Sequence, residues 1–396
     1  MRHAAYSLFI AIVALAIGAC TSTVAGTAMK GEGGRLAPTV DVNKLDVGRY
    51  PTTPSAPLGG AGDPMRGVLI EAQRMANNVV GPWEVEPSLT GSFALGAIVL
   101  KSADALGLIG PQQLATIVGK HPFVNGFSSS RVADGKLILL NAVLRFADAA
   151  SAAAAAAELG DAAQHSSSPP GQRAPIPGHP EAVAASFAVT ESATGKQWAA
   201  VRAFTPHGPY VFMQLAQSVD GLDPAAALIA KTIDLQGPRI DQFRATDPAE
   251  FADISVDPTG LLARTLPVPE TQATVVQNTT YEQRGALHFQ SDPSRSSTLF
   301  TQTGMDLVAM AKTNVYQTKD AAAAAKIVDG FFAEVQPTSK PANGVRNLDG
   351  SRCLQLEDKS FYCLAAADRY AIETSGPTLL DTQQQVAAQY VMLMNS

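Results

Sequence analysis

Three cysteines are the residues of this 396-residue chain whose positions most clearly predict chemistry. Cys20 follows the small residues Gly18 and Ala19 and closes an unbroken apolar run at residues 8–17. Cys353 and Cys363 form a pair near the other end of the chain. A thiol can be acylated, oxidised to a disulfide or used as a metal ligand, so the surroundings of each cysteine decide among these fates.

The surroundings of Cys20 predict a lipoprotein signal peptide at residues 1–20. Arg2 supplies the positive charge, and the apolar run is about half of the ~20 residues that a membrane-spanning helix needs. The sequence IGAC at 17–20 has the form of a bacterial lipobox, although Ile17 stands where Leu is commoner. We expect cleavage before Cys20 and a diacylglycerol on its sulfur, because two acyl chains give stable membrane attachment. The alternatives are failed cleavage or a soluble secreted form.

The cysteine pair Cys353 and Cys363 predicts a disulfide across a β-hairpin. Leu354 and Leu356 alternate with polar residues, the polar stretch 357–359 suits a turn, and Phe361 begins a second strand. This hairpin places Cys353 opposite Cys363, and facing Cβ atoms reach disulfide distance. An oxidising compartment permits the bond, which closes a short loop and adds ~2–3 kcal/mol. A metal pair or redox dithiol would require a tight Cys-x-x-Cys or further ligands nearby, and the sequence has neither.

No other stretch predicts an active site. The sequence lacks a Gly-x-Ser-x-Gly elbow, a His-Glu-x-x-His motif and a Gly-x-Gly-x-x-Gly loop. Residues 110–120 are not a phosphate loop, because Leu114 stands where a Gly is needed and His121 where a Ser or Thr is needed. The serines of 128–131 have no evident His-Asp companion. The histidines are scattered without metal-ligand spacing: His3, His121, His165, His179, His207 and His288. We therefore predict no catalytic residue, no metal, no cofactor and no enzyme.

Charge and length limit the class of protein. Removing residues 1–20 takes away Arg2 and no acid, so the net charge falls from −6 to −7. A mildly acidic chain with 16% charged residues argues against a nucleic-acid partner and against adhesion of the folded body to anionic lipid. A mature chain of this length suggests two domains.

Residues 21–62 are predicted to form a flexible tether. They are rich in Gly, Pro, Thr and Ser and show no sustained periodicity. As a coil of ~40 residues they would span roughly 35 Å. The part at 41–62 need not be free, because Val42, Leu45, Val47 and Tyr50 could lie along the folded body.

The folded part is predicted to begin with an added helical segment at 63–120. Asp63 and Pro64 suit a helix start, and Val68, Ala72 and Met75 continue at helical spacing. A second helical piece follows residues 110–111 and ends at 119. Trp83 lies just after the first helix and is interpreted as a packing residue.

A β-α-β-β-β-α pattern then occurs twice. In the first copy, strands at 137–146, 182–189, 198–204 and 210–215 accompany helices that start at Asp148 and Asp223. In the second copy, strands at 305–315, 352–356, 361–365 and 370–373 accompany helices that start at Asp320 and Asp381. Asp148 and Asp320 are 172 positions apart. We expect an α+β protein of two related domains, 63–256 and 266–396, with helices on one side of each antiparallel sheet.

Three stretches carry a resemblance to a known family. The sequences KLDVGRYPT at 44–52, EAQRMA at 71–76 and VGPWEV at 80–85 resemble those of actinobacterial, chiefly mycobacterial, secreted lipoproteins of unknown function. The resemblance covers nearly the whole mature chain, including the cysteine pair. It implies a lipobox, an N-terminal domain and a smaller C-terminal domain, and it implies no activity.

These observations favour a protein of the cell membrane, lipid-anchored through Cys20 on the extracytoplasmic face. The favoured function is non-catalytic binding of an unknown envelope protein or wall polymer. The alternative is a carrier of a hydrophobic ligand such as a lipid, which would require an apolar pocket of several hundred Å³. An enzyme is the third class, and only the lack of motifs argues against it.

Overall fold

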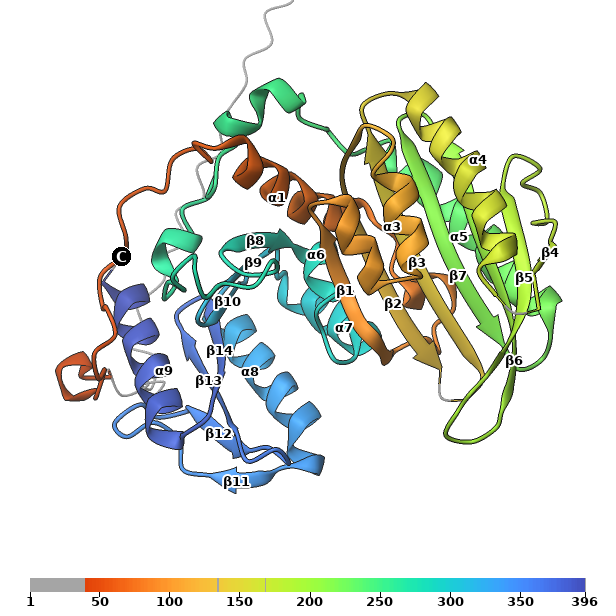
Figure 1. Cartoon of the computed structure of the whole chain (residues 1–396). Coiled ribbons are helices and arrows are strands. Elements are labelled where there is room, and N and C mark those ends of the chain that lie inside the picture. The colour runs from red at the N-terminus through yellow and green to blue at the C-terminus, as the bar shows by residue number, and fades with distance from the viewer. Residues whose placement is uncertain (1–39, 134, 168, 396) are drawn as a thin grey trace, which may run out of the picture. The chain divides into compact units, whose positions relative to one another are not determined.

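Two seven-stranded antiparallel sheets organise the part of the chain that this computed structural model describes, residues 40–133, 135–167 and 169–395. The chain from Asp41 onward forms one compact unit. The predicted signal peptide, its Cys20 and the first part of the predicted tether lie outside the described residues. The two-domain α+β fold class is confirmed (Figure 1).

The first sheet has the strand order β1-β2-β3-β7-β6-β5-β4. Helices cover both of its faces: α3 and α4 pack on one, and α1, α2 and α5 pack on the other. The strands are β1 (Gly91–Leu100), β2 (Phe123–Ala133), β3 (Leu137–Phe146), β4 (Gln172–Arg173), β5 (Val183–Thr190), β6 (Gln197–His207) and β7 (Tyr210–Ser218). The helices are α1 (Pro64–Met75), α2 (Pro82–Val85), α3 (Gln112–Val118), α4 (Ala149–His165) and α5 (Leu222–Ile240), with 3-10 turns η2 (Ala76–Asn78), η3 (Ala103–Leu108) and η4 (Pro248–Asp253).

The second sheet has the order β11-β12-β13-β14-β10-β9-β8. Helix α8 packs on one face and α9 on the other. The strands are β8 (Thr279–Glu282), β9 (Leu307–Met310), β10 (Asn314–Gln317), β11 (Lys340–Ala342), β12 (Arg352–Gln355), β13 (Phe361–Ala367) and β14 (Tyr370–Gly376). The helices are α6 (Gln283–Leu287), α7 (Pro293–Thr303), α8 (Ala321–Val335) and α9 (Leu379–Met394), with 3-10 turns η1 (Val42–Lys44), η5 (Leu262–Arg264) and η6 (Gln336–Thr338).

The two sheets are topological repeats of one another. Replacing β1 to β7 by β8 to β14, strand for strand, converts the first order into the second. Helix α8 then corresponds to α4, and α9 to α5. The predicted duplication is therefore confirmed, and the repeating unit is larger than predicted, with two further strands before the first predicted strand and one after the first helix.

Equivalent aspartates start the equivalent helices α4 and α8. The carboxylate of Asp148 accepts a hydrogen bond from the backbone N–H of Ser151 at 2.7 Å, and that of Asp320 accepts one from Ala323 at 2.8 Å. Such bonds satisfy backbone donors that have no partner within the first turn. The alanine-rich sequences that follow allow both helices to lie close to their sheets.

Three predictions about secondary structure and layers require correction. The segment 63–120 is not only helical, because it contains β1, where Ala94 and Gly96 have positive φ and interrupt the period-2 pattern. Residues 305–315 do not form one strand: the chain reverses at 311–313 between β9 and β10. Helices lie on both sides of each sheet and not on one side.

Residues 41–62, which we name the N-terminal strap, are not a free tether. The hydroxyl of Tyr50 donates to the Asp381 carboxylate of α9 at 2.8 Å, and Leu45 is buried. Further along, the N–H of Ala61 donates to the carbonyl of Ile254 at 2.8 Å, and Gly60 pairs with Ser255 as an isolated β-bridge. The predicted tether thus ends no later than residue 40, and the strap belongs to the folded unit.

The two repeats share one apolar core and are joined by buried polar contacts. One cluster of buried residues includes Phe127 and Phe212 of the first repeat with Tyr281 and Phe331 of the second. The Arg131 guanidinium of β2 donates to the carbonyl oxygens of His288 and Gln290 at 2.9 and 2.8 Å. Because this joint fixes β8 and α6 relative to α1, it also determines how the surfaces of the two repeats face each other.

Candidate functional site

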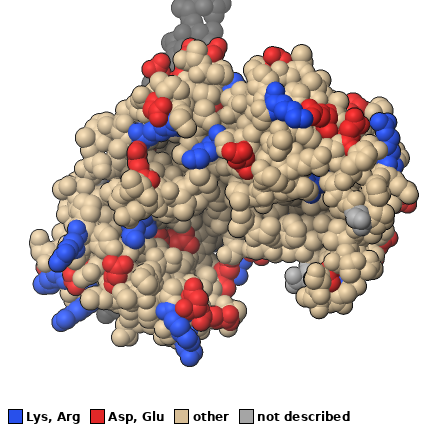
Figure 2. Space-filling model, in the orientation of Figure 1, with Lys and Arg blue, Asp and Glu red and all other residues tan. Residues whose placement is uncertain are grey.

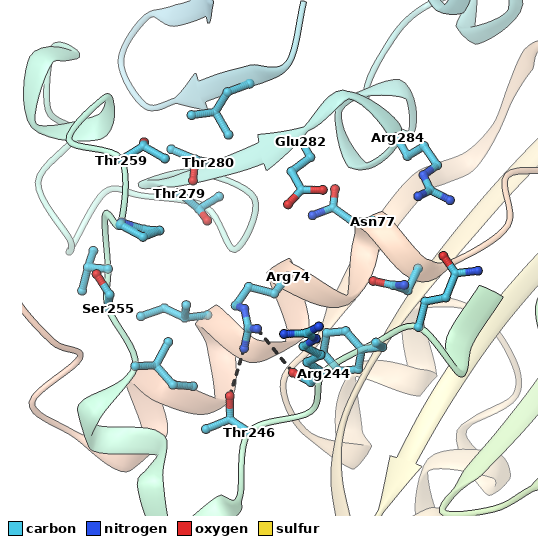
Figure 3. A pocket seen from close by; sticks show the side chains of 18 of the residues that line it. Arg74, Asn77, Arg244, Thr246, Ser255, Thr259, Thr279, Thr280, Glu282 and Arg284 are labelled. Carbon is cyan, nitrogen blue, oxygen red and sulfur yellow. Dashed lines mark hydrogen bonds between the residues drawn. The ribbon is translucent and has the colours of Figure 1, made fainter. Parts of the chain in front are cut away.

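An open cleft of about 830 Å³ lies between the two repeats. Helix α1 and the chain after α5 form one side, and β8 with the start of α6 forms the other (Figure 3). The segment 254–259, which carries the chain from the first repeat to the second, closes one end. The cleft is therefore assembled only when both repeats and their connection are in place.

The base of the cleft is a buried ion network centred on Glu71 of α1. Its carboxylate is fully buried and lies 3.1 Å from the guanidinium of Arg145 on β3, and it also pairs with Arg74. Thr246 completes the set: its backbone N–H donates to the carboxylate at 2.7 Å and its hydroxyl at 3.1 Å. These contacts compensate the loss of water around the charge and hold Arg74 in the cleft wall.

The cleft walls carry charged groups that make no such contacts. Arg244 and Arg284 are exposed, and within the part of the chain that the structure describes neither guanidinium donates a hydrogen bond or forms an ion pair. The carboxylates of Glu250, Asp253 and Glu282 also line the cleft without an ion-pair partner among the described residues. These groups are available to a ligand.

Hydroxyl groups gather toward one end of the cleft. Figure 3 shows Ser255, Thr259, Thr279 and Thr280 on that side, Arg284 on the opposite side and Arg74 between them. Phe243 is the one aromatic residue among the described lining residues. The cleft therefore offers hydrogen bonds and charge, together with apolar surface that comes mainly from aliphatic side chains.

The predicted disulfide is present and lies outside the cleft. Cys353 and Cys363 face each other in the β12–β13 register, with their Cα atoms 4.2 Å apart. Both side chains are buried. The bond therefore ties the hairpin of the second sheet and plays no direct part in the cleft.

The structure brings one predicted serine next to a histidine of the other repeat. Nδ1 of His288 lies 2.9 Å from the hydroxyl of Ser129, and Nε2 lies 3.1 Å from the carbonyl oxygen of Ala76. A carbonyl only accepts, so Nε2 carries the proton and Nδ1 accepts from Ser129. Burial lowers the pKa of His288 to about 4 and keeps the imidazole neutral.

This Ser-His pair is sealed from solvent. The rings of Trp83 and Phe127 pack at 5.2 and 5.0 Å from the imidazole of His288, and Ser129 is buried. Its third partner is a backbone carbonyl rather than a carboxylate. No substrate can reach the pair, which forms part of the joint between the repeats. Trp83 packs there, as predicted.

Three further histidines, His121, His179 and His207, contact acidic side chains. His179 lies 3.1 Å from both Glu181 and Asp234, but through its two different ring nitrogens. His207 pairs with Asp241 at 2.7 Å. Over residues 40–133, 135–167 and 169–395, no group of three His, Cys, Asp or Glu side chains is arranged to hold a metal ion.

A second polar cluster lies under α8. The carboxylate of Glu373 on β14 accepts from the hydroxyls of Tyr316 and Tyr362, each at 2.7 Å, and from the Asn314 amide at 2.9 Å. Burial, together with the Glu373 charge, raises the pKa of both tyrosines, so both stay protonated. The hydrogen bonds satisfy this cluster, which makes it a structural element of the second repeat.

Charged side chains of both signs are mixed on one face of the molecule (Figure 2). Figure 2 shows lysine and arginine side chains interspersed with acidic ones on the face that it draws, separated by wide uncharged areas. Among the described residues, no helix has the length and apolar character needed to cross a bilayer.

The residues of the cleft and of the ion network beneath it were not predicted from the sequence. Glu71 is the one whose position in the sequence could have indicated its role. Glu71 is four residues before Met75 and three after Val68, so it falls on the apolar face of the predicted helix. A charged residue at such a position implies a buried partner. Arg244 and Arg284 sit in irregular or short elements without any pattern.

The comparisons place the chain in a family. Residues 58–256 match the N-terminal domain, and residues 261–396 the C-terminal domain, of the domain of unknown function DUF7373. The chain belongs to this two-part family, for which no function is known.

Comparison with individual proteins adds little beyond the family. The solved extracellular domain of PknH from Mycobacterium tuberculosis is 18% identical over 41% of this chain and 93% of that one, with a TM-score of 0.28. No curated protein matches the chain.

Proposed function

We propose that this chain is a lipid-anchored protein of the cell envelope that binds an envelope component in the cleft between its repeats. The anchor is the acylated Cys20, which holds the folded body on the extracytoplasmic face of the cell membrane. The apolar run at 8–17 and the small residues before Cys20 support the anchor. The buried disulfide supports an oxidising compartment.

The observation that carries the binding function is the cleft itself. It is built from both repeats, its base is fixed by the Glu71 network, and its walls present charged groups without partners. Exposed groups on a rigid, concave frame are the features of a recognition site. A protein or a wall polymer of the envelope is the occupant we propose.

The proposal includes no catalysis. Among the described residues, Ser129 and His288 most resemble a catalytic nucleophile with its general base. Both side chains are buried in the joint between the repeats.

Carriage of a lipid is the weaker alternative. An acyl chain requires an enclosed apolar pocket, whereas this cleft is open and mostly lined by polar residues. Extraction of the native protein followed by mass spectrometry separates the two functions. A co-purifying polar envelope component supports the proposal, and stoichiometric lipid beyond the acyl chains of Cys20 contradicts it.

Two variants test the two parts of the proposal. Cys20→Ala should move the protein from the membrane fraction to the soluble fraction, and a variant that stays membrane-bound contradicts the anchor. Ser255→Trp should obstruct the cleft and abolish recovery of the bound component. Ser192→Trp, at an exposed turn of the first sheet, is the matched control and should leave recovery unchanged.

A further inference from the structure

Arg244 and Arg284 approach the cleft from different repeats. Arg244 follows α5 of the first repeat, and Arg284 lies in α6 of the second. Arg74, which lines the same cleft, is held by Glu71 and by the hydroxyl of Thr246 at 2.9 Å. The two other guanidinium groups have no such partner among the described residues, so their donors remain free for an anion.

A guanidinium group matches an oxyanion of a particular shape. Its planar fork donates two parallel hydrogen bonds to a phosphate or a carboxylate. Glu282 lies only two positions before Arg284, yet the two make no ion pair. A ligand acid can therefore reach Arg284 without displacing an internal carboxylate.

The rest of the lining suits a ligand with many hydroxyl groups. The hydroxyls of Ser255, Thr279 and Thr280 have no hydrogen-bond partner within the described part of the chain. Each can donate one bond and accept others, and the carboxylates of Glu250 and Asp253 can only accept. Sugar hydroxyls both donate and accept, so they complement the two kinds of group together.

A peptide or protein partner fits this lining less well. Protein-binding surfaces derive most of their affinity from buried aromatic and arginine residues in apolar pockets, and peptide grooves are commonly lined by aromatic side chains. Phe243 is the single aromatic in the described lining, and Arg74 already lies 5.8 Å from the centre of its ring.

We propose that the cleft binds an acidic saccharide, a sugar chain bearing phosphate or carboxylate groups. Its acidic groups contact Arg244 and Arg284, and its hydroxyls contact the Ser255, Thr279 and Thr280 side of the cleft (Figure 3). This inference rests on the proposed function and names the chemical class of its ligand. Because both repeats contribute an arginine, the bound saccharide also bridges them.

The test measures binding of three probes to the full-length, lipidated protein in detergent. The probes are short oligosaccharides of matched length: a neutral glucan, an oligogalacturonate that carries carboxylates, and a mannan fragment that carries phosphate monoesters. We expect at least one acidic probe to bind, with affinity that falls as salt is added, and the neutral probe to bind at least about tenfold more weakly. The better acidic probe identifies the anion.

The double variant Arg244→Gln/Arg284→Gln should weaken the acidic probe by about tenfold or more. Arg173→Gln, an exposed arginine on β4 outside the cleft, is the matched control and should bind like the wild type. Equal binding of the neutral probe, or equal affinity of the double variant, overturns the inference. So does recovery of a tightly bound protein without saccharide affinity, which would leave the proposed function standing.

Discussion

The imidazole of His288 accepts a hydrogen bond from the hydroxyl of Ser129 across the boundary between the two repeats, at 2.9 Å. The second ring nitrogen donates to the carbonyl of Ala76, so the histidine is held on both sides by the first repeat. A buried polar contact of this kind specifies one arrangement of the repeats, because any other leaves its groups without partners.

The first prediction concerns acid pH. The pKa of His288 falls from 6.5 to about 4 on folding, mainly through burial and against the attraction of Glu84. Its neutral form therefore stabilises the fold fully above pH 6.5, and the contribution disappears as pH falls toward 4. The free energy of unfolding should therefore be about 3 kcal/mol lower in acid, below the folded-state pKa, than above pH 6.5. Urea unfolding at several pH values should show this loss, and His288→Gln should remove it while lowering stability at pH 7. If the variant loses stability in acid as the wild type does, protonation of His288 is not the cause of that loss.

The second prediction concerns the ion network under the cleft. Arg145→Met removes one partner of the buried Glu71 and should lower the free energy of unfolding by about 3–5 kcal/mol. Replacing Glu71 by Met as well should recover much of that loss, because the one charge left without its partner is that of Arg74, which is partly exposed. Arg66→Met breaks the exposed pair with Glu270 and should cost at most about 1 kcal/mol. Similar costs for both arginines would show that the network is not buried in solution.

The third prediction concerns the contact of α1 with η4. A methyl group on Gly67 would lie 2.0 Å from the carbonyl oxygen of Phe251, so Gly67→Ala should destabilise the protein by about 1–3 kcal/mol. Gly330 in α8 is the control, since its methyl would meet only the end of the Leu299 side chain, which can move. There the gain in helix propensity offsets the crowding. Thermal unfolding of both variants measures this difference in stability. A Gly67→Ala variant as stable as the wild type would contradict the prediction.

The fourth prediction concerns the disulfide. Cys353→Ala/Cys363→Ala should lower stability by about 2–3 kcal/mol, as expected for a closed loop of this length. Because both sulfurs are buried, a reductant should act only after local opening of the hairpin. Labelling of free thiols in native protein, with and without reductant, checks this. Immediate labelling of both cysteines after mild reduction would place them at the surface.

The sequence revealed the parts of the fold that local patterns determine. Asp148 and Asp320 fix their helices through contacts within one turn, and the hairpin around Cys353 alternates regularly, so each could be predicted. Strand β2 could not, because Ser129 and Arg131 make it look like a polar loop. Their partners belong to the other repeat, about 160 residues away, and a local pattern does not reveal them.

The cleft escaped prediction for the same reason. Its free arginines come from two repeats, and nothing in their local sequence distinguishes them from other surface arginines. Only the three-dimensional structure shows which exposed groups share one concavity. The proposed anchor at Cys20 differs in this respect, because a short continuous sequence motif predicts it and no three-dimensional structure is needed.

The contact between Tyr50 and Asp381 joins residues 331 positions apart. The strap is synthesised before α9, so the surface that it binds does not yet exist when the strap is made. Folding of this protein therefore has a late closing step, in which an early segment of the chain meets a much later one. A chain truncated before α9 would leave the strap and the face of the second sheet beneath α9 uncovered and open to proteases.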